Sequence, residues 1–283
     1  MVLRENGPAL RLLVFTDLDA TLLDDSYSWA PAATAVERLK AGGHSIVLCS
    51  SKTLAEMREL AVELGLDAPL VAENGATIAI PVESQLLERS DQGPVQDGYV
   101  IYNQGMGRAA ILKLAHSLRE RHGYRFEGFA DWDAGEVAKR TGLELESAGR
   151  ALNRHGTEPI VWEDTEAHWE IFKSSLNEAG VLAIRGGRFI HLMGETDKAR
   201  GLREVVRRVS KLSGWENKRV IALGDSPNDL QMLSAADIAV VIPNTHHNEE
   251  LKPSAAKVCY ADALGPLGWN SAMHNIMDDL GLD

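Results

Sequence analysis

The sequence is poor in cysteine and in basic residues. Its 283 residues include two cysteines, Cys49 and Cys259. Both lie in apolar runs, so we expect them to be buried and reduced, and no Cys/His spacing suits zinc. Lysine and arginine number 29 against 41 aspartates and glutamates, a net charge of −12. This balance disfavours nucleic acids and anionic membranes as partners, because both attract basic surfaces.

Long apolar segments are also missing. No run approaches the length that spans a membrane, and the first apolar stretch contains Arg11 and continues into aspartates, unlike a signal peptide. We therefore expect a cytoplasmic protein. Hydrophobic residues nevertheless make up 45% of the chain, which is enough for a globular core.

Short apolar runs alternate with helical patterns at both ends of the chain. The runs LRLLVFTD, SIVLCSS and RVIALGDS have the continuous apolar character of strands buried on both faces. Amphipathic stretches separate such runs, which is typical of a parallel α/β sheet. We predict a Rossmann-like parallel sheet core with helices on both faces, formed by residues 1–83 and 195–283.

The middle of the chain has a different pattern. Residues 82–98 are polar and contain glycine and proline, which indicates a boundary. Residues 99–193 mix strand and helix patterns, with a hairpin predicted to turn at Gly186-Gly187. We predict an inserted α+β domain over residues 84–194.

Polar residues gather where the predicted core strands end. Asp17 and Asp19 follow the first strand, Ser50 follows the second, Asp225 follows RVIALG, and Lys198 opens the helix that returns to the core. Active sites of parallel sheets lie outside the carboxyl ends of the strands. Converging carboxylates need a cation, and hard oxygen donors favour Mg²⁺. Each piece alone has a plainer interpretation, such as a solvated loop, but their common placement favours a site.

The spacing of Asp17 and Asp19 fits two chemical roles. Residues two apart on a strand point the same way. The first carboxylate can attack phosphorus and form an aspartyl-phosphate, while the second protonates the leaving oxygen and later deprotonates a water. Lys198 and the Ser50 hydroxyl suit the remaining phosphate oxygens. The pattern predicts hydrolysis of a small phosphorylated substrate.

The segments DLDATLL, LCSSKT, DKARGL and GDSPNDLQML resemble the four motifs of the haloacid dehalogenase (HAD) superfamily of phosphohydrolases. The position of the insertion resembles the type IIB cap of the Cof-like branch. The resemblance implies that Asp17 is the nucleophile and Asp19 the general acid and base. It implies that Mg²⁺ is bound by the carboxylates of Asp17 and Asp225 and the backbone carbonyl of Asp19, with Asn228 and Asp229 supporting the metal site from behind. It also implies that Ser50 and Lys198 bind the phosphate.

Further segments resemble the mannosyl-3-phosphoglycerate phosphatase branch, namely SSKT, ENG, EPIVW and GGRFIHLMGETDK. Ala20 and the Ser50-Ser51-Lys52 triplet depart from the wider superfamily in the way that this branch does. The resemblance implies a substrate with a sugar, a carboxylate and a phosphate. Candidate substrate-binding residues are Arg188, as a bidentate partner of the carboxylate, and Lys52 and Asn74, while Trp132, Trp162 and Trp169 either stack on the sugar or fill the cap core.

Other readings stay open from the sequence. The segment NQGMGRAA imitates a dinucleotide-binding fingerprint, although the insertion is too short and too mixed for a full Rossmann half-pair. The alternative substrate is glucosyl-3-phosphoglycerate or another small sugar phosphate. A phosphosugar mutase shares the aspartyl-phosphate step. The sequence leaves the oligomeric state open.

Overall fold

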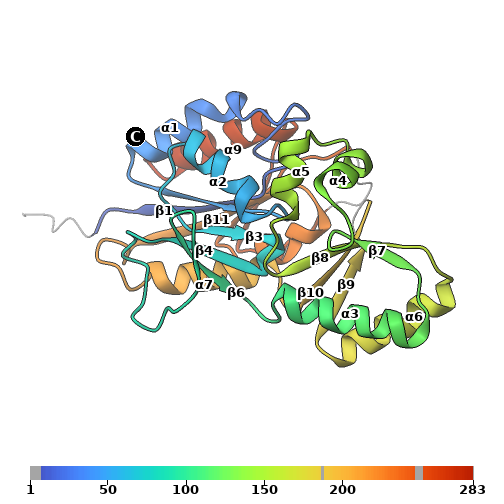
Figure 1. The fold of residues 1–283 in the computed structure, drawn as a ribbon. Helices are drawn as coiled ribbons and strands as arrows, with labels where there is room; N and C mark the ends of the chain where they lie inside the picture. The colour runs from blue at the N-terminus through green and yellow to red at the C-terminus, as the bar shows by residue number, and fades with distance from the viewer. Residues whose placement is uncertain (1–7, 186–187, 246–250, 283) are drawn as a thin grey trace, which may run out of the picture.

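The first apolar run forms a central strand of a large β-sheet. The computed structural model describes residues 8–185, 188–245 and 251–282. Within these residues, the sheet has nine strands in this order: β13 (Lys257–Tyr260), β12 (Ile238–Val241), β11 (Lys218–Gly224), β1 (Arg11–Thr16), β2 (Ser45–Cys49), β3 (Leu70–Ala72), β4 (Thr77–Pro81), β6 (Tyr99–Asn103) and β5 (Val95–Gln96) (Figure 1). The strands from β13 to β3 run parallel, and β4, β6 and β5 are antiparallel to their neighbours.

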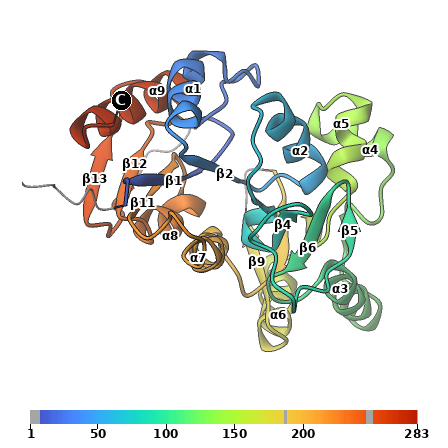
Figure 2. The same cartoon turned by 90° about the vertical axis from the view of Figure 1, so that its left-hand side faces the viewer.

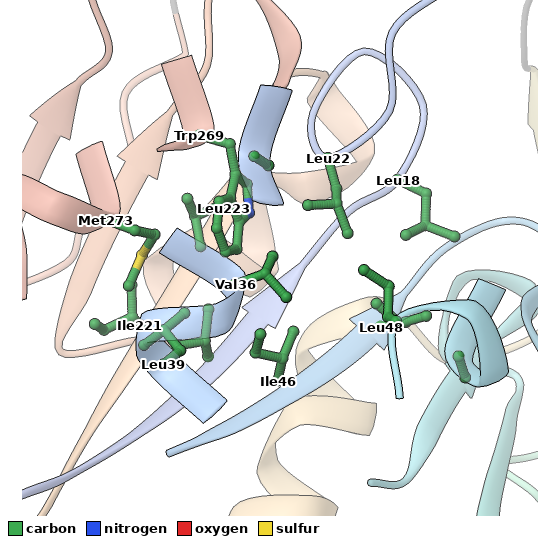
Figure 3. Close-up of a cluster of buried hydrophobic side chains, with 14 of the residues drawn as sticks. Leu18, Leu22, Val36, Leu39, Ile46, Leu48, Ile221, Leu223, Trp269 and Met273 are labelled. Atoms are coloured by element: carbon green, nitrogen blue, oxygen red, sulfur yellow. The ribbon is translucent and has the colours of Figure 1, made fainter. Parts of the chain in front are cut away.

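Helices cover both faces of this sheet, which confirms the predicted core. One face packs against α1 (Ala33–Ala41), α2 (Leu54–Glu63) and α9 (Gly265–Asp279), and the other against α7 (Lys198–Val209) and α8 (Leu230–Ser234) (Figure 2). On the first face, Leu39, Trp269 and Met273 of the helices lie in one buried cluster with Ile221 and Leu223 of β11 (Figure 3). Each such side chain contributes about 1.5–3 kcal/mol when fully buried.

The inserted domain has a smaller antiparallel sheet. Its strands, in spatial order, are β7 (Phe126–Gly128), β8 (Thr157–Trp162), β10 (Ile190–Gly194) and β9 (Val181–Arg185). Its helices are α3 (Arg108–His122), α4 (Ala134–Thr141), α5 (Leu145–Leu152) and α6 (Glu166–Glu178) (Figure 1). β9 and β10 pair as the predicted hairpin, whose turn at Gly186-Gly187 lies outside the described residues. We call this α+β unit the cap.

Two chain segments connect the sheet core and the cap, and they lie side by side. The chain leaves the core after β6 and returns after β10. A Cβ on Gly194 would lie 2.6 Å from the backbone nitrogen of Met106, so only glycine permits this approach. Gly105, in the NQGMGRAA segment, faces the same crossing with a φ of +88°.

The core sheet extends further into the chain than we predicted. Residues 95–103 fall within the range 84–194 that we assigned to the insertion, yet β6 pairs with β4 from Pro81↔Tyr99 to Thr77↔Asn103, and β5 pairs with β6. Our assignment of YVIYN to the insertion was wrong. Alternating apolar residues predict a strand but do not specify its partner, and a polar hairpin loop resembles a domain boundary.

Two composition-based expectations can be compared with the fold. Within the described residues, no helix is both long and apolar enough to cross a membrane. Both cysteines are free; Cys49 is buried on β2, as expected, whereas Cys259 is only half-buried. Cys259 is more exposed because β13 is the outermost strand of the sheet.

Candidate active site

Strand register brings the predicted polar residues to one edge of the core sheet. Thr16, the last residue of β1, pairs with Leu48 of β2 and with Leu223 of β11. The chain continues from these positions to Asp17, Ser50 and Asp225. The carboxyl ends of three adjacent parallel strands therefore deliver these side chains to the same place, as the sequence predicted.

A buried acidic cluster occupies this edge. Asp17, Asp225 and Asp229 are all buried, and each offers a carboxylate oxygen within 4.8 Å of the others. Lys198, at the start of α7, is 1% exposed, and its Nζ donates to Asp17 Oδ1 and to Asp229 Oδ1 at 2.6 Å each. Lys198 thus binds two of the three buried carboxylates.

Burial and crowding change the protonation of this cluster. Burial raises the pKa of Asp17 well above its usual value; Lys198 opposes this shift, and the charges of Asp229 and Asp225 add to it. Burial likewise raises the pKa of Asp225. Burial alone would lower the pKa of Lys198, but Asp17 and Asp229 outweigh it and raise that pKa. The lysine is therefore charged, and the site disfavours the ionised forms of Asp17 and Asp225.

Asp229 is oriented by the loop that it closes. Its Oδ2 accepts hydrogen bonds from the backbone N–H groups of Asp225 and Ser226, both at 3.1 Å, and from the Ser226 hydroxyl at 3.0 Å. A Cβ on Gly224 would lie 2.5 Å from Asp229 Cβ, so glycine is needed for this packing. Because Lys198 and these donors engage both oxygens, Asp229 is suited to support the site from behind.

Asp225 has two partners that sequence reasoning missed. The Thr21 hydroxyl donates to Asp225 Oδ1 at 2.6 Å, and the Asn244 side-chain N–H donates to Asp225 Oδ2. Asn244 follows β12, so the strand-end rule would have found it. Thr21 belongs to the same DLDAT segment as Asp17. Together they orient the Asp225 carboxylate toward the cluster.

Asp19 lies apart from the acidic cluster in this structure. Its side chain is 49% exposed, and its carboxylate forms an ion pair with Lys52 at 3.0 Å. The Lys52 Nζ also lies 4.8 Å from the centre of the Tyr27 ring. Ala20, which follows Asp19, has a φ of +58°. Glycine adopts this left-handed conformation with least strain, so the backbone at position 20 would also suit glycine.

The remaining predicted core residues flank the cluster. Ser50 is buried, and its hydroxyl accepts a hydrogen bond from the backbone N–H of Lys52 at 3.3 Å. The side chain of Asn228 donates to Asn74 Oδ1 at 3.2 Å. Asn74 in turn donates its backbone N–H to the carbonyl of Ser50 at 2.9 Å. Asn74 and Asn228 therefore form one hydrogen-bonded unit that reaches the Ser50 loop.

Candidate residues in the cap have different surroundings. Arg188 is exposed, and its guanidinium donates to the Thr141 carbonyl at the end of α4. Trp162 and Trp169 pack edge to face, with ring centres 5.4 Å apart, beside the cap-core residue Phe172. These two tryptophans therefore fill the cap core. Trp132 packs against Phe129 and Phe189 on the α4–α5 side of the cap.

The donor set fits a hard divalent cation. The cluster offers carboxylate oxygens and no soft ligand, which suits Mg²⁺ better than zinc or copper. The raised pKa values of Asp17 and Asp225 show that a further positive charge would stabilise their ionised forms. The residues present are thus compatible with a metal ion beside Asp17.

This site has a carboxylate bound by a buried lysine at the carboxyl edge of a Rossmann-like sheet. A second domain is inserted into the chain. Together these features are the arrangement of a capped hydrolase. The model of the haloacid dehalogenase-like hydrolase family matches residues 14–120 and 159–262, and the chain belongs to this family. The protein is therefore an enzyme of the hydrolase class.

Individual relatives match nearly the whole chain. A glucosyl-3-phosphoglycerate/mannosyl-3-phosphoglycerate phosphatase from Methanococcoides burtonii is 34% identical over 275 residues, covering 96% of this chain and 98% of that protein. The structure of a subclass IIB sugar phosphatase of the HAD superfamily matches with a TM-score of 0.60 at 18% identity, covering 96% and 100% of the two chains. A haloacid dehalogenase-like hydrolase from Bacteroides thetaiotaomicron matches with a TM-score of 0.64 at 17% identity, covering 95% and 100%. These structures share the fold of this chain.

Proposed function

We infer that this enzyme is a phosphatase that hydrolyses the phosphate ester of a glycosyl-3-phosphoglycerate, with mannosyl-3-phosphoglycerate as the main candidate and the glucosyl compound as the alternative. The observation that carries the proposal is the buried Asp17 carboxylate, 2.6 Å from Lys198 and grouped with Asp225. The substrate assignment is supported by the relative named for both compounds, which is 34% identical over almost the full length of both proteins.

The proposed reaction has two displacement steps at phosphorus. In the first, a carboxylate oxygen of Asp17 attacks phosphorus, the bond to the ester oxygen breaks, and Asp19 gives a proton to the leaving alkoxide. In the second, Asp19 takes a proton from water, whose oxygen attacks phosphorus. The acyl-phosphate bond breaks, and phosphate and free Asp17 result.

The core residues have complementary tasks in this scheme. Lys198 and Ser50 bind phosphoryl oxygens and offset their negative charge. Mg²⁺, held by Asp17, the backbone carbonyl of Asp19 and Asp225, would supply further positive charge for the phosphoryl group. In this structure the Asp19 carboxylate forms an ion pair with Lys52. In the proposed reaction it turns away from that ammonium group to reach the leaving oxygen.

The nucleophile assignment is tested by Asp17→Asn. The amide has nearly the same shape but cannot attack phosphorus, so we expect phosphate release from mannosyl-3-phosphoglycerate with Mg²⁺ to fall at least about a thousandfold. Thermal unfolding of the variant should remain cooperative. Asp25→Asn serves as the matched control, because Asp25 is an exposed aspartate of the same loop. Near-wild-type turnover by Asp17→Asn would remove Asp17 as the nucleophile.

A further inference from the structure

The turn after β3 holds a carboxylate that the proposed chemistry does not use. Glu73 belongs to the sheet core, in the turn between β3 and β4, and it is 0% exposed. A buried carboxylate is unfavourable unless hydrogen bonds or opposite charges satisfy it. The origin of its partners therefore indicates its role.

Among the residues that the structure describes, the partners of the Glu73 carboxylate come from the cap. Its oxygens accept hydrogen bonds from the backbone N–H groups of three consecutive residues, His155 (2.7 Å), Gly156 (3.2 Å) and Thr157 (2.8 Å). The Thr157 hydroxyl donates as well, at 2.6 Å. Arg154 Nε lies 3.6 Å from the same carboxylate. One core side chain is thus bound by four consecutive cap residues, three through hydrogen bonds and Arg154 through an ion pair.

The backbone of this turn is held in an uncommon conformation. Glu73 and Asn74 have φ values of +53° and +57°, which residues other than glycine rarely adopt. Gly75 lies against the start of α7, where a Cβ would be 2.1 Å from the carbonyl oxygen of Asp197. Asp197 directly precedes Lys198. Such strained positions persist only where their surroundings determine them closely, and they are frequent at functional sites.

The turn also binds the loop that carries Ser50. The backbone N–H of Glu73 donates to the carbonyl of Lys52, and that of Asn74 donates to the carbonyl of Ser50, both at 2.9 Å. From the cap side, Arg154 Nη2 donates to the carbonyl of Ser51 at 3.0 Å. The cap segment 154–157 is therefore fastened both to the loop that carries Ser50 and to the turn that lies against the start of α7.

We propose that Glu73 is a positioning residue that fixes the cap against the phosphate-binding loops, and that it thereby determines how well the enzyme handles substrates that extend beyond the phosphate. This inference rests on the proposed function. The phosphate of any monoester meets Ser50 and Lys198 in the core. The sugar and carboxylate of a glycosyl-3-phosphoglycerate must instead reach cap residues, so displacement of the cap weakens only that second set of contacts.

The test compares two substrates in Glu73→Gln. The amide keeps the shape of the side chain but removes its charge and directs an N–H₂ group toward the cap donors. With mannosyl-3-phosphoglycerate we expect kcat/KM to fall about tenfold or more, because small displacements of binding groups have large effects. With p-nitrophenyl phosphate we expect a loss of less than about threefold, since the core contacts are kept. Thr157→Val removes only the hydroxyl that donates to Glu73. It should lower kcat/KM for both substrates in the same pattern as Glu73→Gln, but by less.

A control variant separates cap positioning from cap stability. Glu158→Gln also neutralises a buried carboxylate, but the partners of Glu158 are Arg108 at 2.8 Å and the backbone of Ala130 at 2.7 Å, both in the cap. It should lower the unfolding temperature without separating the two substrates. Hydrogen exchange at the amides of residues 155–157 should be faster in Glu73→Gln than in Glu158→Gln or wild type.

The possible outcomes are distinct. Equal losses on both substrates, or unchanged exchange at residues 155–157 in Glu73→Gln, would overturn the role of Glu73. If Glu73→Gln does not fold, Thr157→Val decides the question in the same assays. If wild-type enzyme releases no phosphate from either substrate, the proposed function fails, while the exchange measurement still reports separately on whether Glu73 holds the cap.

Discussion

Asp17 and Asp19 are two residues apart and yet meet different lysines. Asp17 pairs with buried Lys198, whereas the more exposed Asp19 pairs with Lys52. This separation keeps the repulsion between the two carboxylates small. We propose that Lys52 exchanges Asp19 for a substrate phosphate or carboxylate, which would leave Asp19 free to act as an acid.

Arg188 provides a prediction at the scale of single residues. We propose that its exposed guanidinium binds the substrate carboxylate, since arginine matches carboxylate geometry with two parallel hydrogen bonds. Arg188→Ala should therefore raise KM for mannosyl-3-phosphoglycerate about tenfold or more and leave p-nitrophenyl phosphate hydrolysis nearly unchanged. Steady-state kinetics on both substrates measure this. Equal effects on the two would place Arg188 outside substrate recognition, and Arg125→Ala, at another exposed cap arginine, is the control.

The residues predictable from sequence were those that a single rule could locate. Asp17, Ser50 and Asp225 follow buried strands, and the ends of parallel strands share an edge. Thr21 was missed because it orients Asp225 from 204 residues away in the sequence, and Asn244 was missed although it follows the end of β12. Glu73 was missed as well, since its partners lie more than eighty residues away in the cap.

Among the elements, β10 carries a half-buried histidine near Arg154. His191 pairs with Pro159 of β8 and Ile184 of β9. Its Nδ1 is buried and has no hydrogen-bond partner among the described residues. Burial, together with the nearby charge of Arg154, lowers the pKa of His191 to about 4 from its usual 6.5. The folded state therefore keeps this imidazole neutral at neutral pH.

His191 predicts how stability depends on pH. Between pH 6.5 and 4 the unfolded chain protonates this histidine and the folded protein does not, so the free energy of unfolding falls as the pH is lowered through that window. Each pKa unit corresponds to about 1.4 kcal/mol, and we expect His191→Gln to remove about 1–3 kcal/mol of this loss. Urea unfolding at pH 7 and pH 4 measures it. His122→Gln, at an exposed histidine, should behave as wild type, and an unchanged slope in His191→Gln would contradict the prediction.

Most helices and strands could be predicted from the sequence, but which elements lie next to each other in space could not always be predicted. The buried strands and amphipathic helices of the core follow from apolar runs and helical periodicity. β5 and β6 were placed in the wrong domain because the polar loop before them is a hairpin excursion from the sheet. Its Asp91 is fastened to Arg208 of α7, a contact that local sequence patterns do not encode.

For the whole molecule, the acidic cluster links metal binding to stability. Ionised Asp17 and Asp225 repel each other in the buried site, and a cation relieves this repulsion only in the folded state. Ligands that bind the folded state alone stabilise it, by about 2.7 kcal/mol at one hundred times their dissociation constant. Metal binding should therefore be measurable without any assay of activity.

We predict that Mg²⁺ raises the unfolding temperature of the wild-type protein by several degrees and that EDTA reverses this shift. Asp225→Asn should lose most of the shift because a ligand is removed, and Asp25→Asn should keep it. Differential scanning calorimetry with and without Mg²⁺ measures the effect. The same shift in Asp225→Asn as in wild type would exclude Asp225 as a metal ligand.

The adjacent crossings at Gly105 and Gly194 make the cap a replaceable module. Since both strands of the connection leave the core at one point, a short peptide joining residues 104 and 195 could close the gap, or an unrelated cap could be grafted there. Either change would remove the cap donors that now bind the Glu73 carboxylate. Any exchange of caps, natural or engineered, must therefore supply a new set of donors for Glu73 or replace that glutamate.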